Sequence, residues 1–258
     1  MRVKCAMACG LKEAGGRTRL FVRAALEPGA EVTLDDGQSH YLLHVLRART
    51  GDRVLLFNGR DGEWQAEIVT GSKRRMAVRL KRRTGPQREV PDLWLVFAPV
   101  KKTPSDYLTQ KATELGVSRL QPVFTRRTNV TRLNRERLLA NAIEAAEQSG
   151  RLTVPQIAGV VTLEKLLEAW PVDRRMLFCD EEGEAKSVAQ GARDMGEGPC
   201  AILTGPEGGF AADERMLLRS RPFVMPVSLG PRILRADTAA LAALAIWQSV
   251  KGDWRERP

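Results

Sequence analysis

The segments AILTGPEGGF (residues 201–210) and VSLGPRILRADTAALAALAIW (residues 227–247) decide how the second half of this chain is interpreted. Each segment begins as an apolar strand, passes through a glycine-containing bend and enters a helix. Ligands of open parallel sheets bind beyond the carboxyl ends of the strands, where glycines let them approach the backbone closely. The two bends are therefore the candidate ligand site, although either bend alone could be an ordinary strand-to-helix turn.

Strand and helix patterns alternate throughout the sequence around these segments, from residue 91 onward. The run DLWLVFAPV (92–100) is almost continuously apolar, as expected for a strand covered on both faces. Repeated alternation predicts an α/β fold, with a mainly parallel sheet and helices on both faces. Further strands are predicted at 119–124, 175–180, 200–204 and 223–229. Helices are predicted at 104–115, 134–150, 162–170, 184–192, 211–220 and 237–250.

The first third of the chain has a different pattern, with short strands and a single helix. The helix is predicted at 35–50, with Asp35 or Asp36 as its cap and Gly51 at its end. Strands are predicted at 19–26, 53–58, 63–70 and 75–82, with Asp61-Gly62 as a hairpin signal. Short antiparallel strands around one helix predict a small β-barrel. The predicted division is a poorly ordered leader (1–18), this barrel domain (19–88) and the α/β domain (91–252), separated within TGPQREVP (84–91).

Basic residues are concentrated in the barrel domain. The formal charge of the chain is +10, and residues 1–90 hold a surplus of 8 basic over acidic residues. The stretch KRRMAVRLKRRTGPQR (73–88) contains eight Lys and Arg residues and no acid. Such a stretch can neutralise several phosphates and gain from counterion release, so it favours a nucleic-acid partner over a solvated strand face.

Several classes of protein are disfavoured by the composition. The chain has 258 residues, of which 43% are hydrophobic and 28% are charged, as in a soluble globular protein. No apolar run reaches the roughly 18 residues of a membrane span, and residues 1–18 lack the apolar core of a secretory signal. The four cysteines form no C-x-x-C pair, and the two histidines are His40 and His44, so a metal site is not expected. We expect reduced thiols and a cytoplasmic location. Neither G-x-G-x-x-G nor G-x-x-x-x-G-K-[ST] occurs.

LTGPEGGF followed about twenty residues later by LGPRILRADTA resembles the RsmE family of the SPOUT superfamily. Members are S-adenosylmethionine-dependent methyltransferases that act on a uracil N3 of 16S ribosomal RNA in the small subunit. The segments HVLRARTGDRVLLFNG (44–59), QKATELGVSRLQPVF (110–124) and EAAEQSGRLTVPQI (144–157) also look like the family. The resemblance covers residues 19–252, and the joint occurrence of these motifs in this order is specific, whereas GPEGG alone is not.

The resemblance implies a fold with two further features. The N-terminal domain would be a PUA-like β-barrel that binds RNA. The C-terminal SPOUT-type α/β domain would contain a deep trefoil knot, which no periodicity in the sequence could indicate. The resemblance also implies a homodimer, and the substrate would be 16S ribosomal RNA or the assembled small subunit.

The resemblance places the methyl donor between the two bends. One side of the site would be formed by Leu203, Thr204, Gly205, Pro206, Glu207, Gly208 and Gly209, with Glu207 bracing the loop. The other side would be formed by Leu229, Gly230, Ile233, Leu234 and Thr238. An adenine ring needs apolar walls with a few backbone donors and acceptors, which these residues supply.

Arg235 is the candidate catalytic residue, by motif match and by charge. Uracil N3 is a weak nucleophile until its proton leaves, and negative charge then spreads onto the flanking carbonyl oxygens, where a fixed cation favours the transition state. The family's R-T-E-T-A reads Arg235-Ala236-Asp237-Thr238-Ala239 in this chain. Asp237 is expected to be the N-cap of the helix, and it could also accept the proton. A histidine base is not expected, since the second domain has no histidine.

Six basic residues are the candidate RNA contacts, although each of them could instead be an ordinary surface cation without a role in binding. They are Arg47, Lys73, Arg74, Arg75, Arg127 and Arg151. Two other functions stay open at this stage: a SPOUT methyltransferase that modifies another RNA position, such as a ribose 2′-hydroxyl, and a noncatalytic RNA-binding factor of ribosome assembly.

Overall fold

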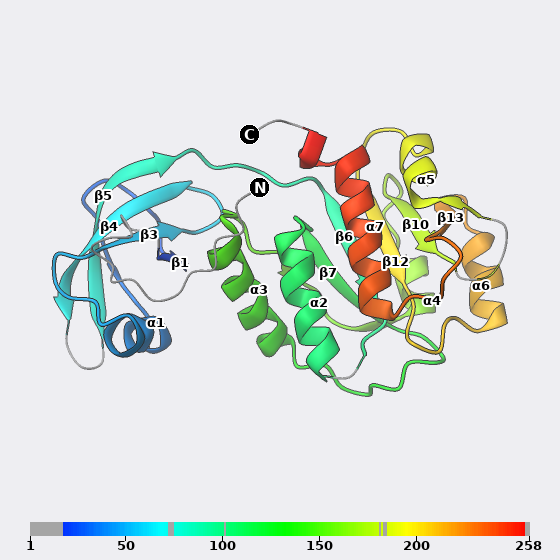
Figure 1. Cartoon of the computed structure of the whole chain (residues 1–258), viewed down its shortest axis with the longest axis horizontal. Coiled ribbons are helices and arrows are strands. Elements are labelled where there is room, and N and C mark those ends of the chain that lie inside the picture. Colours follow the sequence, from blue (N-terminus) through cyan, green and yellow to red (C-terminus); the bar gives the residue numbers. More distant parts are fainter. Residues whose placement is uncertain (1–17, 72–74, 101, 181, 183–184, 256–258) are drawn as a thin grey trace. The chain divides into compact units, whose positions relative to one another are not determined.

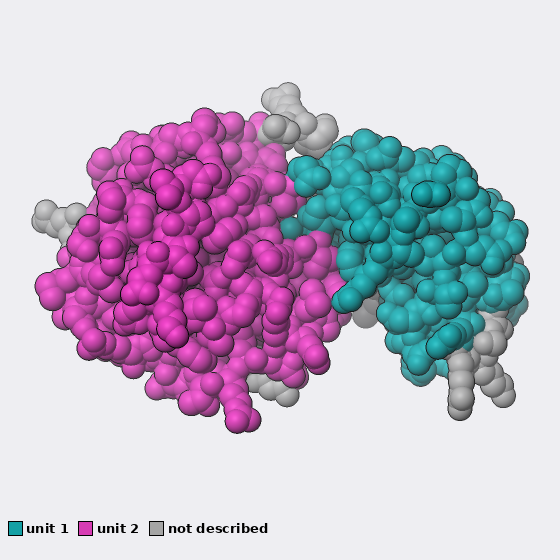
Figure 2. Space-filling view, turned by 180° about the vertical axis from the view of Figure 1, so that it is seen from behind, with its two compact units in different colours: residues 1–89, 146–153 teal, residues 90–145, 154–258 magenta. Residues whose placement is uncertain are grey.

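The computed structural model describes residues 18–71, 75–100, 102–180, 182 and 185–255 (Figure 1). The chain divides into two compact units, which Figure 2 draws in different colours. The first unit ends at Glu89 but also contains Ala146–Thr153, and the second contains Val90–Ala145 and the chain from Val154 onward. The contacts thus place residues 146–153 with the first unit, whereas the sequence analysis placed them in the second. Residues 1–17 of the predicted leader lie outside the described residues.

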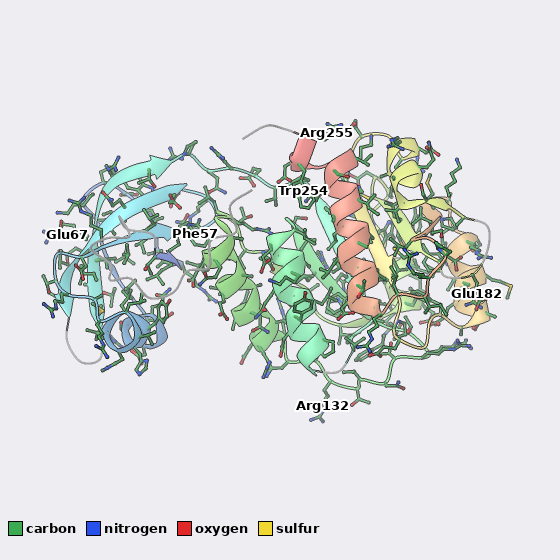
Figure 3. The ribbon with its side chains drawn as sticks, viewed as in Figure 1. Phe57, Glu67, Arg132, Glu182, Trp254 and Arg255 are labelled. Carbon is green, nitrogen blue, oxygen red and sulfur yellow. The ribbon has the colours of Figure 1, made fainter. Side chains whose placement is uncertain are left out.

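A five-stranded sheet is the core of the first unit, with its strands in the order β1-β3-β4-β5-β2. The strands are β1 (Arg19–Phe21), β2 (Glu31–Thr33), β3 (Arg53–Phe57), β4 (Glu63–Gly71) and β5 (Met76–Gly85). The pair β1–β3 is parallel and the other pairs are antiparallel. Alternate side chains such as Val54, Ala66 and Val78 are fully buried, as the two-residue period of a strand requires. At the end of β3, the Arg19 guanidinium lies 4.6 Å from the centroid of the Phe57 ring (Figure 3).

This sheet is a half-barrel rather than the β-barrel that was predicted. Its two edges are β1 and β2, and no pairing between them is found among the described residues. The sequence analysis missed β2 because the strand has three residues, of which only Val32 is buried, and so shows no alternation. The hairpin predicted at Asp61-Gly62 is confirmed, since β3 and β4 pair antiparallel from Phe57 opposite Glu63.

The helix of the first unit is shorter than predicted and passes from an α-helix into a π-helix. It begins as α1 (Asp36–His40), with the Asp35 side chain accepting a hydrogen bond of 2.8 Å from the Gln38 amide, so the predicted cap is confirmed. It continues as the π-helix η1 (Tyr41–Val45). The predicted end at Gly51 is wrong, because Arg47 already adopts a φ of 53°, which ends the helix.

Parallel strands form the sheet of the second unit, as predicted. Their order is β11-β13-β10-β12-β6-β7-β8, with β9 pairing with β7, and every recorded pair is parallel. The longer strands are β6 (Leu93–Phe97), β7 (Arg119–Phe124), β10 (Arg175–Cys179), β12 (Cys200–Thr204) and β13 (Val224–Ser228). The two-residue strands are β8 (Gln156–Ile157), β9 (Val161–Thr162) and β11 (Lys186–Ser187). The sequence analysis missed all three short strands, since two residues are too few to show a period.

Helices cover both faces of this sheet, also as predicted. The helices are α2 (Lys102–Glu114), α3 (Arg135–Ser149), α4 (Leu163–Glu168), α5 (Val188–Asp194), α6 (Ala212–Arg219), α7 (Ala236–Val250) and the 3₁₀ turn η2 (Asp253–Arg255). Leu93, Leu95 and Phe97 pack with α2, α3, α5 and α7 on one face. Val96 faces the other side, with α4 and α6. Figure 1 shows α7 lying across the sheet beside α2.

The position of β13 brings the two bends of the sequence together. β13 lies between β10 and β11, and β10 in turn pairs with β12. Because β10, β12 and β13 are parallel, their carboxyl ends reach the same edge of the sheet. The bend after Thr204 and the bend after Ser228 therefore leave the sheet one strand apart, on either side of Cys179.

Candidate functional site

A cleft of about 150 Å³ opens at this edge of the second unit. Its walls come from the ends of β10, β12 and β13, the two bends and the first turn of α7. The lining residues are Cys179, Asp180, Thr204, Gly205, Pro206, Glu207, Gly209, Phe210, Val227, Ser228, Leu229, Gly230, Pro231, Arg232, Ile233, Leu234, Ala236 and Ala239. Most of these side chains are apolar or absent, and the polar ones are Asp180, Thr204, Glu207, Ser228 and Arg232. A flat apolar ligand with a few hydrogen-bonding groups fits such walls.

The bend after β12 is a tight turn closed by a buried aromatic ring. The Gly209 amide donates to the Pro206 carbonyl at 2.9 Å, and Gly209 has a φ of 68°, which favours glycine. A Cβ at Gly205 would lie 2.6 Å from the Phe210 ring. Phe210 is buried and packs edge-on against Phe178, with 5.0 Å between ring centroids. The sequence therefore needs glycine at position 205 to let the chain leave the strand beside this ring.

The bend after β13 turns at another glycine and leaves an apolar side chain in solvent. Gly230 has a φ of 99°, and its amide donates to the Ser228 hydroxyl at 3.2 Å. Leu229 and Leu234 are half-buried in the cleft, whereas Ile233 is 94% exposed at its rim. Ile233 therefore presents apolar surface at the rim to a ligand that extends out of the cleft.

Nine of the twelve predicted cofactor residues line the cleft, and three do not. The nine are Thr204, Gly205, Pro206, Glu207, Gly209, Leu229, Gly230, Ile233 and Leu234. Leu203 is fully buried in the core on the α4 and α6 side of the sheet. Gly208 contacts Arg127, and Thr238 bonds to Asp237 through its amide at 2.8 Å.

Arg235 lies beside the cleft, at the start of α7. It is exposed, and its carbonyl accepts the first helical hydrogen bond, from the Ala239 amide at 2.8 Å. Within the described part of the chain, its guanidinium makes no hydrogen bond and no ion pair, so its donors are available to a ligand. Asp237 is not the N-cap as predicted, because α7 begins at Ala236 and Arg235 occupies the N-cap position. Its carboxylate lies in the first helical turn, where the helix dipole favours a negative charge.

Two lining residues that the sequence analysis missed come from the end of β10. Burial raises the pKa of the Cys179 thiol to about 12, so this group is a neutral thiol at physiological pH and not a nucleophile. Asp180 is buried and bound by Arg219, whose Nε and Nη2 donate to its Oδ2 at 2.8 and 2.5 Å. Cys179 is the last residue of β10 and Asp180 follows it. The neighbours of β10 are fixed by the order of strands in the sheet, so no local signal in the sequence could have identified these two residues.

The other missed lining residues belong to the two segments already singled out by sequence. They are Phe210, Val227, Ser228, Pro231, Arg232, Ala236 and Ala239. Extending the candidate site along each segment would have found them. Ala236 and Ala239 show that the first turn of α7 is a wall of the cleft and that its small side chains leave room there.

The predicted RNA contacts lie in both units. Arg47 and Arg75 are exposed in the first unit, and Arg127 is exposed in the second. Arg151 is half-buried, and its Nε donates to the Thr153 hydroxyl at 3.0 Å, so it is less accessible than predicted. The other two predicted contacts, Lys73 and Arg74, lie outside the described residues.

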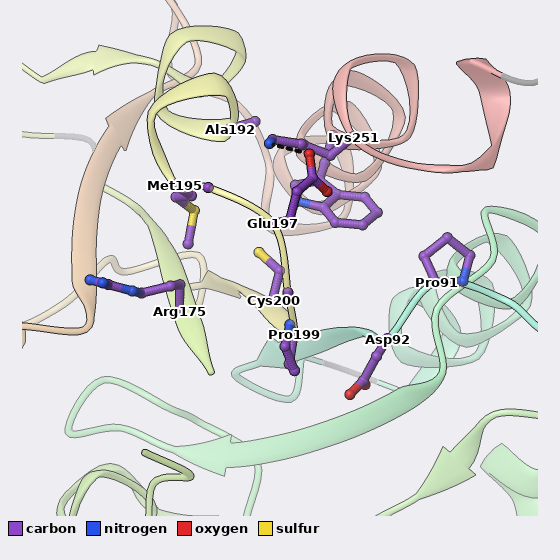
Figure 4. Close-up of a pocket in the computed structure, with 12 residues that line it drawn as sticks. Pro91, Asp92, Arg175, Ala192, Met195, Glu197, Pro199, Cys200 and Lys251 are labelled. Carbon is purple, nitrogen blue, oxygen red and sulfur yellow. Dashed lines mark hydrogen bonds and ion pairs between the residues drawn. The ribbon is translucent and has the colours of Figure 1, made fainter. Parts of the chain in front are cut away.

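Two further cavities of the second unit are not lined by the two glycine bends. One, of about 220 Å³, lies at the opposite edge of the sheet, near the amino ends of β10 and β12 (Figure 4). Its rim holds the ion pair of Lys251 with Glu197, at 2.9 Å. The other, of about 270 Å³, is lined by Arg137 and Asp106, which pair with each other at 2.5 Å. The polar side chains named here already have partners, which makes both cavities weaker candidates than the smaller cleft.

The part of the chain that the structure describes contains neither a candidate metal site nor a candidate membrane span. No group of three or more His, Cys, Asp or Glu side chains could hold a metal ion there. None of the described helices combines the length and the hydropathy needed to cross a bilayer.

Comparisons with known proteins match both units. A family model of an RNA methyltransferase domain matches residues 87–248, and one of an RNA methyltransferase PUA domain matches residues 34–81. A curated relative from Rickettsia conorii, named ribosomal RNA small subunit methyltransferase E, is 36% identical over 88% of this chain and 93% of its own length. The Bacillus subtilis relative with the same name is 28% identical over 87% of this chain and 92% of its own.

Solved structures with the same fold contain a bound ligand. A ribosomal RNA small subunit methyltransferase E from Neisseria gonorrhoeae bound to S-adenosyl methionine has a TM-score of 0.83 and 29% identity, covering 92% of this chain and 99% of its own. A Legionella pneumophila methyltransferase in complex with the cofactor SAM has a TM-score of 0.82 and 30% identity, covering 92% and 98%. Both similarities cover 92% of this chain and therefore extend into both units.

Proposed function

This chain belongs to the family of RNA methyltransferases with a PUA domain, and from that premise we propose that it transfers a methyl group from S-adenosylmethionine to N3 of a uridine in 16S ribosomal RNA. The observation that carries the proposal is the cleft where both glycine bends meet, in a chain whose relatives over nearly their full length are named for methylation of small-subunit ribosomal RNA. A ribosomal RNA substrate would make the cytoplasm the place of action.

The residues of the cleft fit S-adenosylmethionine. Gly205 approaches Phe210 too closely for any side chain, and the positive φ of Gly209 and Gly230 keeps the backbone of both bends open to a ligand. Apolar surface from Leu229 and Leu234 suits the adenine ring, and backbone groups can bond its edge. The enclosed volume is smaller than the roughly 300 Å³ typical of ligand sites, so part of the ligand would lie against the exposed rim.

Arg235 is the proposed catalytic residue. The donor supplies an electrophilic methyl group on its sulfonium. The loss of the N3 proton makes uracil nucleophilic and spreads negative charge onto its two carbonyl oxygens. The exposed guanidinium of Arg235, without a partner in the described chain, is available to bond one of these oxygens and to stabilise that charge in the transition state.

A substitution at the rim of the cleft tests whether the donor contacts Ile233. We expect Ile233→Asp to weaken S-adenosylmethionine binding roughly tenfold or more, because burial of such a side chain contributes about 1.5–3 kcal/mol. Val172→Asp is the matched control, since Val172 is fully exposed and lies away from the cleft. Titration calorimetry on both variants measures the effect. Equal affinities would show that the donor does not reach Ile233.

RNA binding is proposed for the first unit, together with Arg127 and Arg151. The support is the PUA match at residues 34–81, the exposure of Arg47 and Arg75, and the basic stretch 73–88. Lys73 and Arg74 belong to that stretch. A basic stretch suits a phosphate backbone, because attraction to phosphates needs charge rather than a deep pocket.

The salt dependence of RNA affinity tests this assignment. Neutralising Lys73, Arg74 and Arg75 together should reduce the magnitude of the negative slope of log affinity against log salt by up to about 2–3, since each phosphate contact contributes roughly 0.7 to 0.9. Neutralising Lys165, Lys186 and Arg193, three exposed cations of the second unit, removes the same charge and should leave the slope nearly unchanged. Binding isotherms at several salt concentrations supply both slopes, and equal slopes would place the contacts elsewhere.

A trefoil knot and a homodimer are also proposed. Two features support the knot: β13 lies between strands that precede it in the chain, and α7 then returns across the sheet to pack with α2 and α5. The dimer is supported by α7, which is apolar nearly all round and leaves Leu241 and Ile246 only partly buried. Light scattering at micromolar concentration measures the dimer directly.

Nucleoside mass spectrometry of ribosomal RNA tests the reaction itself. RNA from cells lacking the gene should lose one 3-methyluridine, and the purified protein with S-adenosylmethionine should restore it. The loss of a 2′-O-methyl nucleoside instead would identify another methyltransferase activity. RNA affinity without donor affinity would identify a binding factor of ribosome assembly.

A further inference from the structure

The turn that follows β7 lies against the loop that follows β12, although the two are about eighty residues apart. The turn comprises residues 125–128 and is closed on itself, since the Thr128 amide donates to the Thr125 carbonyl at 3.1 Å. The Thr125 amide in turn donates to the Thr128 hydroxyl at 3.0 Å. The turn is therefore a defined structure that can hold a neighbour in place.

Arg127 joins this turn to the glycine loop of the cleft. Its Nη1 donates to the Gly208 carbonyl at 2.8 Å. A Cβ on Gly208 would lie 3.5 Å from the Arg127 Cβ and 3.7 Å from its Cδ, so the stem of the arginine also packs on this glycine. Gly208 is thus held from outside the cleft, which explains why it does not line the cleft with Gly205 and Gly209.

Glu214 joins the same two segments a second time. Its side chain is buried, with Oε1 accepting from the Arg126 amide and Oε2 from the Ala211 amide, each at 2.9 Å. One carboxylate therefore bonds the turn and the end of the glycine loop at once. Hydrogen bonds to a buried charged group contribute more than neutral ones, so this link fixes the base of the loop.

We propose that Arg127 is a positioning residue for the methyl donor, acting through the Gly208 carbonyl. With Glu214 fixing one end of the loop, the Arg127 bond fixes its bend, and the loop is held in its binding conformation before the donor arrives. A loop ordered in advance does not lose that conformational freedom on binding, which strengthens affinity. The inference rests on the proposed function and adds to it a role for a residue expected only to contact RNA.

The affinity for S-adenosylmethionine in the absence of RNA tests the inference, because an RNA contact cannot contribute to that measurement. We expect Arg127→Ala to weaken binding roughly three- to tenfold, the range of one hydrogen bond, and Arg127→Lys to recover part of the loss. Arg132→Ala is the matched control. It removes the same charge from the same connection, and Arg132 is exposed at the surface of the second unit (Figure 3).

Turnover and melting separate positioning from other roles. A positioning residue should raise the KM for S-adenosylmethionine more than it lowers kcat, with a melting temperature close to that of the unaltered protein. An unchanged donor affinity in Arg127→Ala, with a raised KM for RNA, would overturn the inference and leave the methyltransferase intact. The absence of donor binding by the unaltered protein would instead overturn the proposed function.

Discussion

Replacing Arg235 with alanine should lower kcat about 10²- to 10³-fold while S-adenosylmethionine affinity changes less than about twofold, the pattern of a group that acts only in the transition state. Arg235 does not line the cleft, and its guanidinium has no partner within the described chain. The change therefore removes no contact that holds the donor or the fold. Single-turnover kinetics with RNA, together with calorimetry on the donor, measure the two effects separately.

Two further variants refine this result. Arg235→Lys keeps the charge but loses the planar fork, so it should recover only part of the rate. Asp237→Asn keeps an acceptor for the Thr238 amide but cannot accept a proton, and a rate close to that of the unaltered protein would remove Asp237 as a base. Full activity of Arg235→Ala would refute the proposed role of Arg235. Arg232, which lines the cleft, would then be the next candidate for the catalytic cation.

Replacing Gly205 with alanine should weaken S-adenosylmethionine binding more than tenfold and destabilise the protein by about 1–3 kcal/mol, the usual cost of overpacking. The added Cβ would lie 2.6 Å from Phe210, whose ring is held against Phe178. Either the ring or the loop has to move, and both are walls of the cleft. Calorimetry and thermal melting measure the two effects.

Gly159→Ala is the control for this change. Gly159 lies in the same unit, has no positive φ, and has no atom within 4 Å of the position of a Cβ, so alanine should be tolerated. A second variant tests the cause. Adding Phe210→Leu to Gly205→Ala makes room beside the new methyl group and should restore part of the affinity, in a double-mutant cycle. If Gly205→Ala alone binds the donor normally, the cleft is not the donor site.

The alternation of strands and helices was predictable because the five longer strands of the second unit each have five or six residues, enough to show an apolar pattern in the sequence. β7 and β12 have the predicted bounds, and the other long strands and all six helices differ by a few residues at their ends. β8, β9 and β11 have two residues each and leave no period in the sequence. Their positions depend on neighbouring strands, which only the fold supplies.

The site was predictable in part, for the same reason. Glycines such as Gly205, Gly209 and Gly230 are required by local geometry, so the sequence identifies them. Asp180 and Cys179 could not be identified, because their role depends on β10 lying between β12 and β13. Arg127 was expected to contact RNA, but its bond to Gly208 joins residues 81 positions apart, which no local pattern contains.

The sequence by itself determined the fold class, the two glycine bends and the residues that the family motifs name, because strand period, backbone freedom and motif order are local properties of the chain. The tertiary structure alone decided that β13 lies between β10 and β11, which brings those bends to one cleft, and that Gly208 faces Arg127 rather than the cleft. These features depend on contacts between segments far apart in the chain. Such contacts form only when folding packs the distant segments against each other, so no local stretch of sequence contains them.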